Sequence, residues 1–254
     1  RVVEAAARHR ISLDVHEPIK PTGLRRTWPN MMTREGARGQ EYNAWAADGG
    51  NPPEHETVLF FTRLLAGPMD FTPGVLDLEL ESAPGEDRPA WAPRVRTTVA
   101  KQLALYVVIH SPMQMAADLP ENYDPDDPAF RFIRDVPADW ADTRVLAAEI
   151  GDYVVVARRD RGSDAWWIGA ITDERAREVE VDLSFLSEGA GMGDAGRPGR
   201  AGWTATFWAD GPDAHWLDRP FELDVSERAV EPGDTLTLRL APGGGQAVRI
   251  RPAG

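Results

Sequence analysis

The chain changes its sequence pattern once, near residue 140, and this change limits the folds that it can adopt. After the segment DWADT, seven short runs rich in β-branched and aromatic residues follow one another, separated by turn residues. Such runs are typical of strands in an antiparallel sandwich or barrel. They are DYVVVARR, AWWIGAIT, REVEVDLSF, WTATFWAD, FELDVS, DTLTLRL and QAVRI. We therefore expect an all-β domain over residues 143–254.

The first part of the chain alternates helical and extended segments. Its apolar spacing predicts helices over residues 3–9, 41–47, 55–65 and 95–109, and the run ISLDV at 11–15 predicts a strand. This alternation is typical of βα units around a parallel sheet, in which the loops after the strands carry the active site. We therefore predict an α/β domain over residues 1–142, placed before the β domain.

Composition excludes several classes of function. The net charge of −13 argues against nucleic acid as a partner, because a phosphate backbone requires a basic surface. No apolar run reaches the roughly 18 residues that a membrane-spanning helix needs; the longest candidate is LALYVVI. The absence of cysteine excludes disulfide bonds and thiolate metal sites. Because the chain opens at Arg1 and runs directly into a helical pattern, we expect it to be a piece of a longer protein.

The stretch DVHEPIKPTGLRRTWPNMMTREGARGQEYNAW, residues 14–45, contains three glutamates. Glu17 ends the predicted strand, a position where barrel enzymes hold catalytic groups. Glu35 and Glu41 flank two glycines, which allow the backbone to turn until both carboxylates converge. Three carboxylates suit calcium better than zinc, because no imidazole or thiolate cluster accompanies them. The same groups suit glycoside cleavage, which needs a carboxylic acid and a carboxylate base.

The residues alone leave a second interpretation open. Acidic side chains are commonly solvated surface charges, and four nearby arginines are available to pair with these glutamates: Arg25, Arg26, Arg34 and Arg38. Trp28 and Trp45 suit a sugar platform and core packing about equally. Asp70, in the segment GPMDFTPG, is interpreted as a residue that caps a loop, and residues 188–202 as a glycine-rich loop.

Several motifs together resemble glycoside hydrolase family 97, the calcium-dependent α-glucosidases and α-galactosidases. They are HEPIKPTGLRRTWPNMMTREGARGQEYNAW, FTRLLAGPMDFTPG, ALYVVIHSPMQMAADLPENY, EIGDYVVVARR and WWIGAITDE, which extend over nearly the whole chain. The resemblance implies an N-terminal β super-sandwich, a central (β/α)8 barrel and a C-terminal β domain. This chain then corresponds to the last part of the barrel, residues 1–142, and the C-terminal antiparallel β-sandwich or barrel domain, residues 143–254.

The resemblance also implies separate roles for the residues of the acidic stretch. Glu17 matches the general base of the inverting branch and also touches calcium and substrate, and His16 matches a substrate contact. Glu35 matches a calcium ligand. Glu41 matches the general acid that protonates the glycosidic oxygen, and it too lies against the calcium. The implied catalytic residues are therefore Glu17 and Glu41, and the implied ligands of Ca²⁺ are Glu17, Glu35 and Glu41.

These roles lead to an expected function for the full-length protein. The retaining branch is expected to use an upstream aspartate as nucleophile and to lack a glutamate at the position of Glu17. Glu17 therefore favours inverting, calcium-dependent hydrolysis of α-glucosides or oligosaccharides. The alternatives are a retaining α-galactosidase and a non-catalytic carbohydrate-binding β module. Because the N-terminal domain of the family supplies one calcium ligand, we expect this chain alone to be almost inactive. The resemblance suggests a periplasmic or extracellular location.

Overall fold

The computed structural model describes residues 1–16, 19–80, 93–188 and 202–253. The first part contains α1 (Val2–Arg8), β1 (Leu13–Val15), β2 (Met31–Arg34) and α2 (Tyr42–Trp45). It continues with α3 (His55–Phe61), α4 (Val99–Val108) and α5 (Pro128–Asp135). Short 3-10 helices occupy Leu24–Arg26, Arg63–Ala66 and Pro120–Asn122. The predicted helices are therefore present, and α4 begins at Val99 because the side chain of Thr98 caps it by accepting from the backbone N–H of Lys101.

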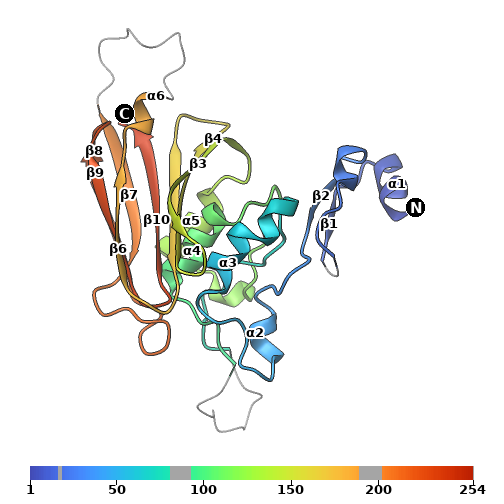
Figure 1. Cartoon of the computed structure of the whole chain (residues 1–254), viewed down its shortest axis with the longest axis horizontal. Coiled ribbons are helices and arrows are strands. Elements are labelled where there is room, and N and C mark those ends of the chain that lie inside the picture. The colour runs from blue at the N-terminus through green and yellow to red at the C-terminus, as the bar shows by residue number, and fades with distance from the viewer. Residues whose placement is uncertain (17–18, 81–92, 189–201, 254) are drawn as a thin grey trace.

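β1 and β2 pair in parallel, as the alternation of helices and strands predicts. The sequence pattern did not predict β2, which is only four residues long. Figure 1 shows this pair and α1 on the side of the molecule opposite to the large sheet, with α3, α4 and α5 between them. The first part of the chain is thus a short α/β segment.

The second part is an antiparallel β domain, as predicted. Its large sheet has the order β3-β4-β5-β10-β7-β8, and a smaller sheet pairs β6 with β9. The seven predicted runs form β4 to β10: Tyr153–Asp160, Trp166–Thr172, Arg177–Asp182, Trp203–Asp210, Leu223–Val230, Thr235–Leu240 and Gly245–Pro252. A short helix, α6 (Phe185–Glu188), follows β6. The sequence pattern did not predict β3 (Trp140–Glu149). This strand crosses the domain boundary that we placed between residues 142 and 143, and that boundary stays a prediction.

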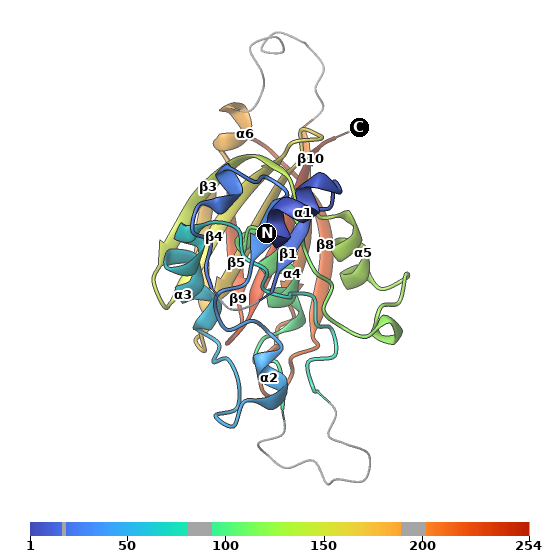
Figure 2. The same ribbon diagram turned by 90° about the vertical axis from the view of Figure 1, so that its right-hand side faces the viewer.

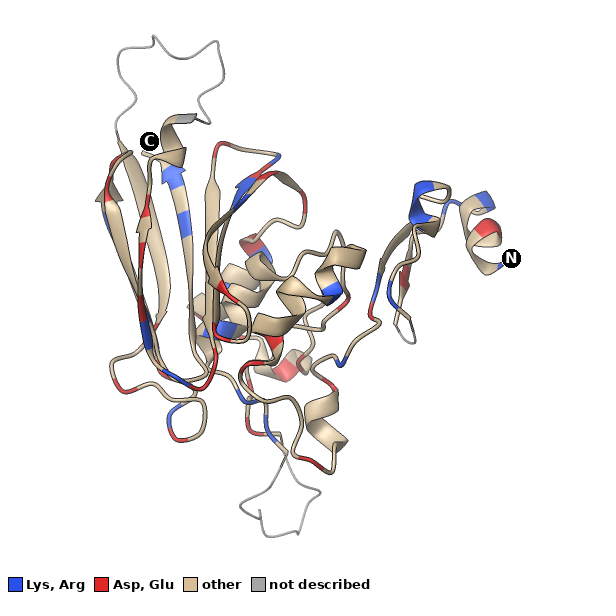
Figure 3. Cartoon of the chain, viewed as in Figure 1, with Lys and Arg blue, Asp and Glu red and all other residues tan. Residues whose placement is uncertain are grey.

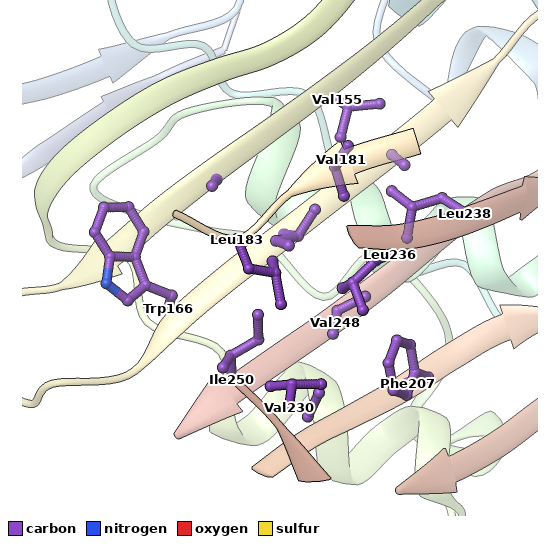
Figure 4. Close-up of a cluster of buried hydrophobic side chains, with 14 of the residues drawn as sticks. Val155, Trp166, Val181, Leu183, Phe207, Val230, Leu236, Leu238, Val248 and Ile250 are labelled. Carbon is purple, nitrogen blue, oxygen red and sulfur yellow. The ribbon is translucent and has the colours of Figure 1, made fainter. Parts of the chain in front are cut away.

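The two sheets form a sandwich around one apolar core. Side chains from the large sheet, such as Trp166, Phe207 and Val248, pack against Val181 and Leu238 of the smaller sheet. Figure 4 shows these side chains meeting in the space between the strands. Burying this apolar surface is the main source of stability of the domain.

The opposite face of the large sheet is covered by helices, as Figure 2 shows. α4 lies directly on β5 and β10, where glycines allow close approach. A Cβ at Gly169 would stand 2.7 Å from the carbonyl oxygen of Ala104, and a Cβ at Gly245 would stand 2.8 Å from the Cα of Lys101. The other sides of α4 pack against the segment 69–78. The β domain therefore supports α4, which in turn packs against the segment that contains Asp70.

Candidate active site

Three adjacent extended segments bring side chains to one edge of the α/β part. His16 follows β1, and Glu35 follows β2, whose parallel pairing places the N–H of Glu35 3.1 Å from the carbonyl oxygen of Val15. A parallel bridge joins Arg34 to Met69, so Asp70 stands at the same edge. The carboxyl ends of parallel strands are where barrel enzymes place catalytic groups. This explains why residues far apart in sequence meet here.

His16 lies at the centre of the cluster. Its Nδ1 lies 2.9 Å from Oδ2 of Asp70, and its Nε2 lies 3.7 Å from Oε2 of Glu35 and 3.6 Å from Oε1 of Glu41. The contact with Asp70 orients the ring, so that Nε2 faces the two glutamates. His16, Glu35 and Glu41 each offer a ligand atom, and these atoms all lie within 4.8 Å of one another.

The cluster fits a cation that prefers oxygen ligands. A Cβ placed on Gly39 would stand 2.5 Å from Oε2 of Glu41 and 2.9 Å from Oε1 of Glu35, so only glycine leaves room for both carboxylates. The side chain of Glu35 is only 4% exposed. Two carboxylates held this close repel each other unless a cation or a proton lies near them. Carboxylate oxygens are the ligands that Ca²⁺ prefers.

Glu41 differs from Glu35 in facing open space. Its side chain is 35% exposed, and it lines a cavity of about 680 Å³ together with Gln40, Ala44, Thr72, Val75, Asp77, Leu80, Val95, Ala117, Asp118, Leu119 and Asn122. The hydroxyl of Thr72 lies 3.2 Å from Oε2 of Glu41. Glu41 can therefore reach a molecule bound in the cavity, whereas Glu35 is enclosed by protein.

The close carboxyl groups change the protonation of their neighbours. Burial, together with the charge of Asp70, raises the pKa of Asp14 to about 6. Burial alone would lower the pKa of His16, but the hydrogen bond with Asp70 and the charges of Glu35 and Glu41 raise that pKa above its ordinary value. The described cluster thus attracts positive charge, which agrees with a cation site.

Arg63 holds the backbone beneath the cluster. Arg63 is only 6% exposed, and its guanidinium donates to the carbonyl oxygens of Arg34 and Glu35, both at 2.6 Å, and to those of Gly67 and Pro68. Burial lowers its pKa to about 10, which leaves it protonated at neutral pH. One side chain therefore ties the segment that carries Glu35 to the segment that leads to Asp70.

The structure brings together three of the four predicted site residues: His16, Glu35 and Glu41. Glu17 lies outside the described residues, as does most of the glycine-rich segment 188–202. Asp70, which the sequence suggested as a loop cap, contacts His16 instead, and Thr72 and Arg63 were missed altogether. The signal for Asp70 was available, because it follows a short apolar segment just as Glu17 follows the predicted strand.

The structure also bears on the arginines and tryptophans whose roles the sequence left open. Arg38, one of the arginines available to the glutamates, pairs with Asp48 at 3.2 Å. Trp28 is partly exposed, whereas the side chain of Trp45 is 63% exposed, so Trp45 does not serve core packing within the described residues.

The sequence of the chain matches two models of a known protein family. The model described as "Glycoside hydrolase 97" matches residues 1–37, and the model described as "Glycosyl-hydrolase 97 C-terminal, oligomerisation" matches residues 139–251. The chain belongs to glycoside hydrolase family 97. The first match contains His16 and Glu35, and the second covers the antiparallel β domain. No helix in the described part of this family 97 chain is long and apolar enough to cross a membrane.

Relatives of this family 97 chain include the retaining α-galactosidase of Bacteroides thetaiotaomicron, which is 35% identical over 99% of the chain and 35% of its own length. Solved structures include a family 97 enzyme from Pseudoalteromonas sp. strain K8 in complex with acarbose. That structure has a TM-score of 0.87 at 49% identity, covering 99% of this chain and 36% of its own. A variant of the same enzyme, in complex with panose, matches equally well. The chain therefore spans about a third of the length of these relatives.

Proposed function

We propose that the full-length protein hydrolyses α-glycosidic bonds, with Glu41 as the general acid. The observation that carries this proposal is the convergence of His16, Glu35 and Glu41 at one strand edge, with only Glu41 and His16 open enough to reach a ligand. Glycoside cleavage needs a carboxylic acid that protonates the leaving oxygen, and Glu41 faces a cavity large enough to hold sugar units.

The neighbours of Glu41 prepare it for this step. The hydroxyl of Thr72 lies within hydrogen-bond distance of Oε2 of Glu41, which limits the rotation of the carboxyl group. The carboxyl group is then held toward the cavity, where it gives its proton to the glycosidic oxygen as the bond to the leaving sugar breaks. Once the leaving group departs, the cavity opens to water, from which Glu41 regains its proton.

His16 and the other carboxylates complete the site. Asp70 fixes the ring of His16 with Nε2 toward the carboxylates, where it is placed to bind a sugar hydroxyl. We propose Glu17, the residue after His16, as the base that takes a proton from the attacking water. Glu35 and Glu41, with Glu17, would hold a calcium ion, for which the convergence of Glu35 and Glu41 over Gly39 is the structural support. Such an ion would supply positive charge that keeps the carboxylates of Glu17 and Glu35 ionised and in place.

We propose α-glucosides as the substrates and inversion as the stereochemical course. Panose, which is bound by the Pseudoalteromonas relative at 49% identity, is a trisaccharide of α-linked glucose. The presence of Glu17 also favours an inverting base over a nucleophile, with a gap of about 6.5–9.5 Å between the two carboxyl groups. Retaining α-galactosidase activity is the second candidate, because the Bacteroides relative with that activity is 35% identical.

The test uses the full-length protein with p-nitrophenyl α-glucoside and p-nitrophenyl α-galactoside, and NMR to identify the first sugar anomer released. We expect β-glucose to appear first, and activity to disappear with a calcium chelator and return with added calcium. Glu41→Gln should lower kcat by at least about a thousandfold for natural substrates, because an amide cannot protonate the leaving oxygen. Release of α-galactose would instead support the second candidate. No turnover of either substrate would contradict the proposed function.

A further inference from the structure

A second cavity adjoins the one that contains Glu41. It encloses about 490 Å³ between α2 and the connection from β7 to β8, and its wall includes Trp45, Asp48, Arg94, Arg96 and Trp216. Ala44 lines both cavities. The backbone at 94–96 also runs along both, because Val95 lines the first and its two neighbours line the second. The two cavities therefore lie side by side and share part of their lining.

The walls of the second cavity have the chemistry that binds sugars. Trp45 is 63% exposed, and Tyr42 fixes its ring through an edge contact with centroids 4.6 Å apart. On the opposite wall, the guanidinium of Arg96 lies 5.9 Å from the ring centroid of Trp216. Aromatic faces pack against the C–H faces of sugar rings, while guanidinium and carboxylate groups bind hydroxyls. Asp48, Arg94 and Arg96 all line the cavity, so it offers both acceptors and donors to the hydroxyls of a polyol.

Hydrogen bonds hold the connection from β7 to β8, which carries Trp216, against the neighbouring segments. Nη1 of Arg94 donates to the carbonyl oxygen of Leu217 at 2.8 Å, and the N–H of Trp216 donates to the carbonyl oxygen of Pro242 at 3.1 Å. The N–H of Val99, in the first turn of α4, donates to the carbonyl oxygen of Pro220 at 2.9 Å. These bonds fix a connection of the β domain beside the second cavity.

We propose that this second cavity binds the distal sugar units of the leaving group, so that the protein prefers longer α-linked oligosaccharides. Glu41 protonates the oxygen of the leaving sugar, so units beyond that oxygen extend from the cavity of Glu41 across Ala44 and between Trp45 and Trp216. The C-terminal β domain then contributes to substrate choice through Trp216. This inference rests on the function proposed above.

The experiment compares Trp216→Ala and Trp45→Ala in the full-length protein. Phe221→Ala is the matched control, because Phe221 is an exposed aromatic residue, 49% accessible, that does not line the cavity. For each protein, kcat/KM is measured for maltose to maltoheptaose and for p-nitrophenyl α-glucoside. We expect the ratio of kcat/KM for maltohexaose to that for the aryl glucoside to fall roughly tenfold in both tryptophan variants, as the loss of one aromatic platform implies. Trp216→Phe should retain most of the ratio, and Phe221→Ala all of it.

Two outcomes would overturn the inference. In one, both substrates lose activity equally, which would mean that Trp216 acts only on the fold. In the other, neither tryptophan variant loses activity on either substrate. If the unmodified protein does not cleave α-glucosides, the proposed function fails separately. Calorimetric titration with maltohexaose then tests the binding site alone. It compares Glu41→Gln with the double variant that also carries Trp216→Ala. Equal affinity in the two proteins, or no binding, contradicts it.

Discussion

Thr72 adopts a backbone conformation that few β-branched residues tolerate. Its φ is 63°, in the left-handed region, where a non-glycine residue of this shape costs about 1–3 kcal/mol. Its hydroxyl oxygen accepts from the backbone N–H of Gln40 at 3.2 Å and lies 3.2 Å from the carboxylate of Glu41. Because these two contacts involve the acid and the residue before it, we interpret the strain as the cost of fixing the position of Glu41.

Replacing Thr72 separates strain from function. Thr72→Gly should leave the melting temperature unchanged or raise it, because glycine adopts positive φ freely, while kcat should fall about tenfold as the contact with Glu41 is lost. Thr72→Ser keeps the hydroxyl and should keep most of kcat. Thermal unfolding and steady-state kinetics of the full-length variants measure both. An unchanged kcat in Thr72→Gly would contradict the role assigned to Thr72, and a lower melting temperature would contradict the strain.

At the scale of elements, the sequence pattern correctly predicted the helices and strands whose own residues favour the conformation that they adopt in the fold. We did not predict β3, because its sequence WADTRVLAAE contains several good helix formers. Pairing with β4 makes these ten residues a strand. α5 was missed although Asp127 caps it and Pro128 occupies its first turn, which is a recognisable start signal. In the site, Glu35 and Glu41 lie close in sequence and were predicted. Arg63 acts through contacts with carbonyl oxygens 28 and 29 residues away, which no local pattern contains, whereas Asp70 is marked in the sequence only by its place after a short apolar segment.

α4 is fixed to its neighbours by a buried ion pair. Nζ of Lys101 lies 3.0 Å from Oε2 of Glu56 in α3, and both side chains are nearly inaccessible to solvent. The same ammonium donates to the carbonyl oxygen of Thr172 at 3.0 Å, at the end of β5. One lysine therefore joins two helices of the first part to the large sheet.

Lys101→Met should destabilise the protein by about 3–5 kcal/mol, because it leaves the carboxylate of Glu56 buried without its partner. The double variant Lys101→Met with Glu56→Leu should recover much of that loss, since no buried charge then lacks a partner. Denaturant unfolding of the four proteins of this cycle measures the coupling. Strictly additive effects would contradict the ion pair.

At the scale of the whole molecule, ionisable side chains are spread over both parts of the chain, including the junction where the helices meet the β domain. Figure 3 shows acidic and basic residues interspersed along both parts of the chain, so the net charge of −13 is not confined to one of them. Asp210, at the end of β7, is partly buried at this junction. Its Oδ2 accepts from the N–H groups of Ala241 and Gly245 at 2.8 and 2.9 Å, which joins β7 to the start of β10.

Asp210 gives the molecule a predictable dependence on pH. Burial of its carboxyl group raises its pKa to about 6 from an ordinary value of 3.8. Below pH 3.8 this carboxyl is protonated in both the folded and the unfolded state. As pH rises toward 6, only the unfolded state releases its proton, so the folded state loses relative stability, and the loss is complete above pH 6.

Asp210→Asn keeps an acceptor for both N–H groups and removes the titration. Between pH 4.5 and 7, we expect the stability of this variant relative to the unmodified protein to increase by about 2 kcal/mol. Denaturant unfolding at several pH values measures this difference, and a difference that is constant across the range would mean that Asp210 ionises as freely in the fold as in the unfolded chain.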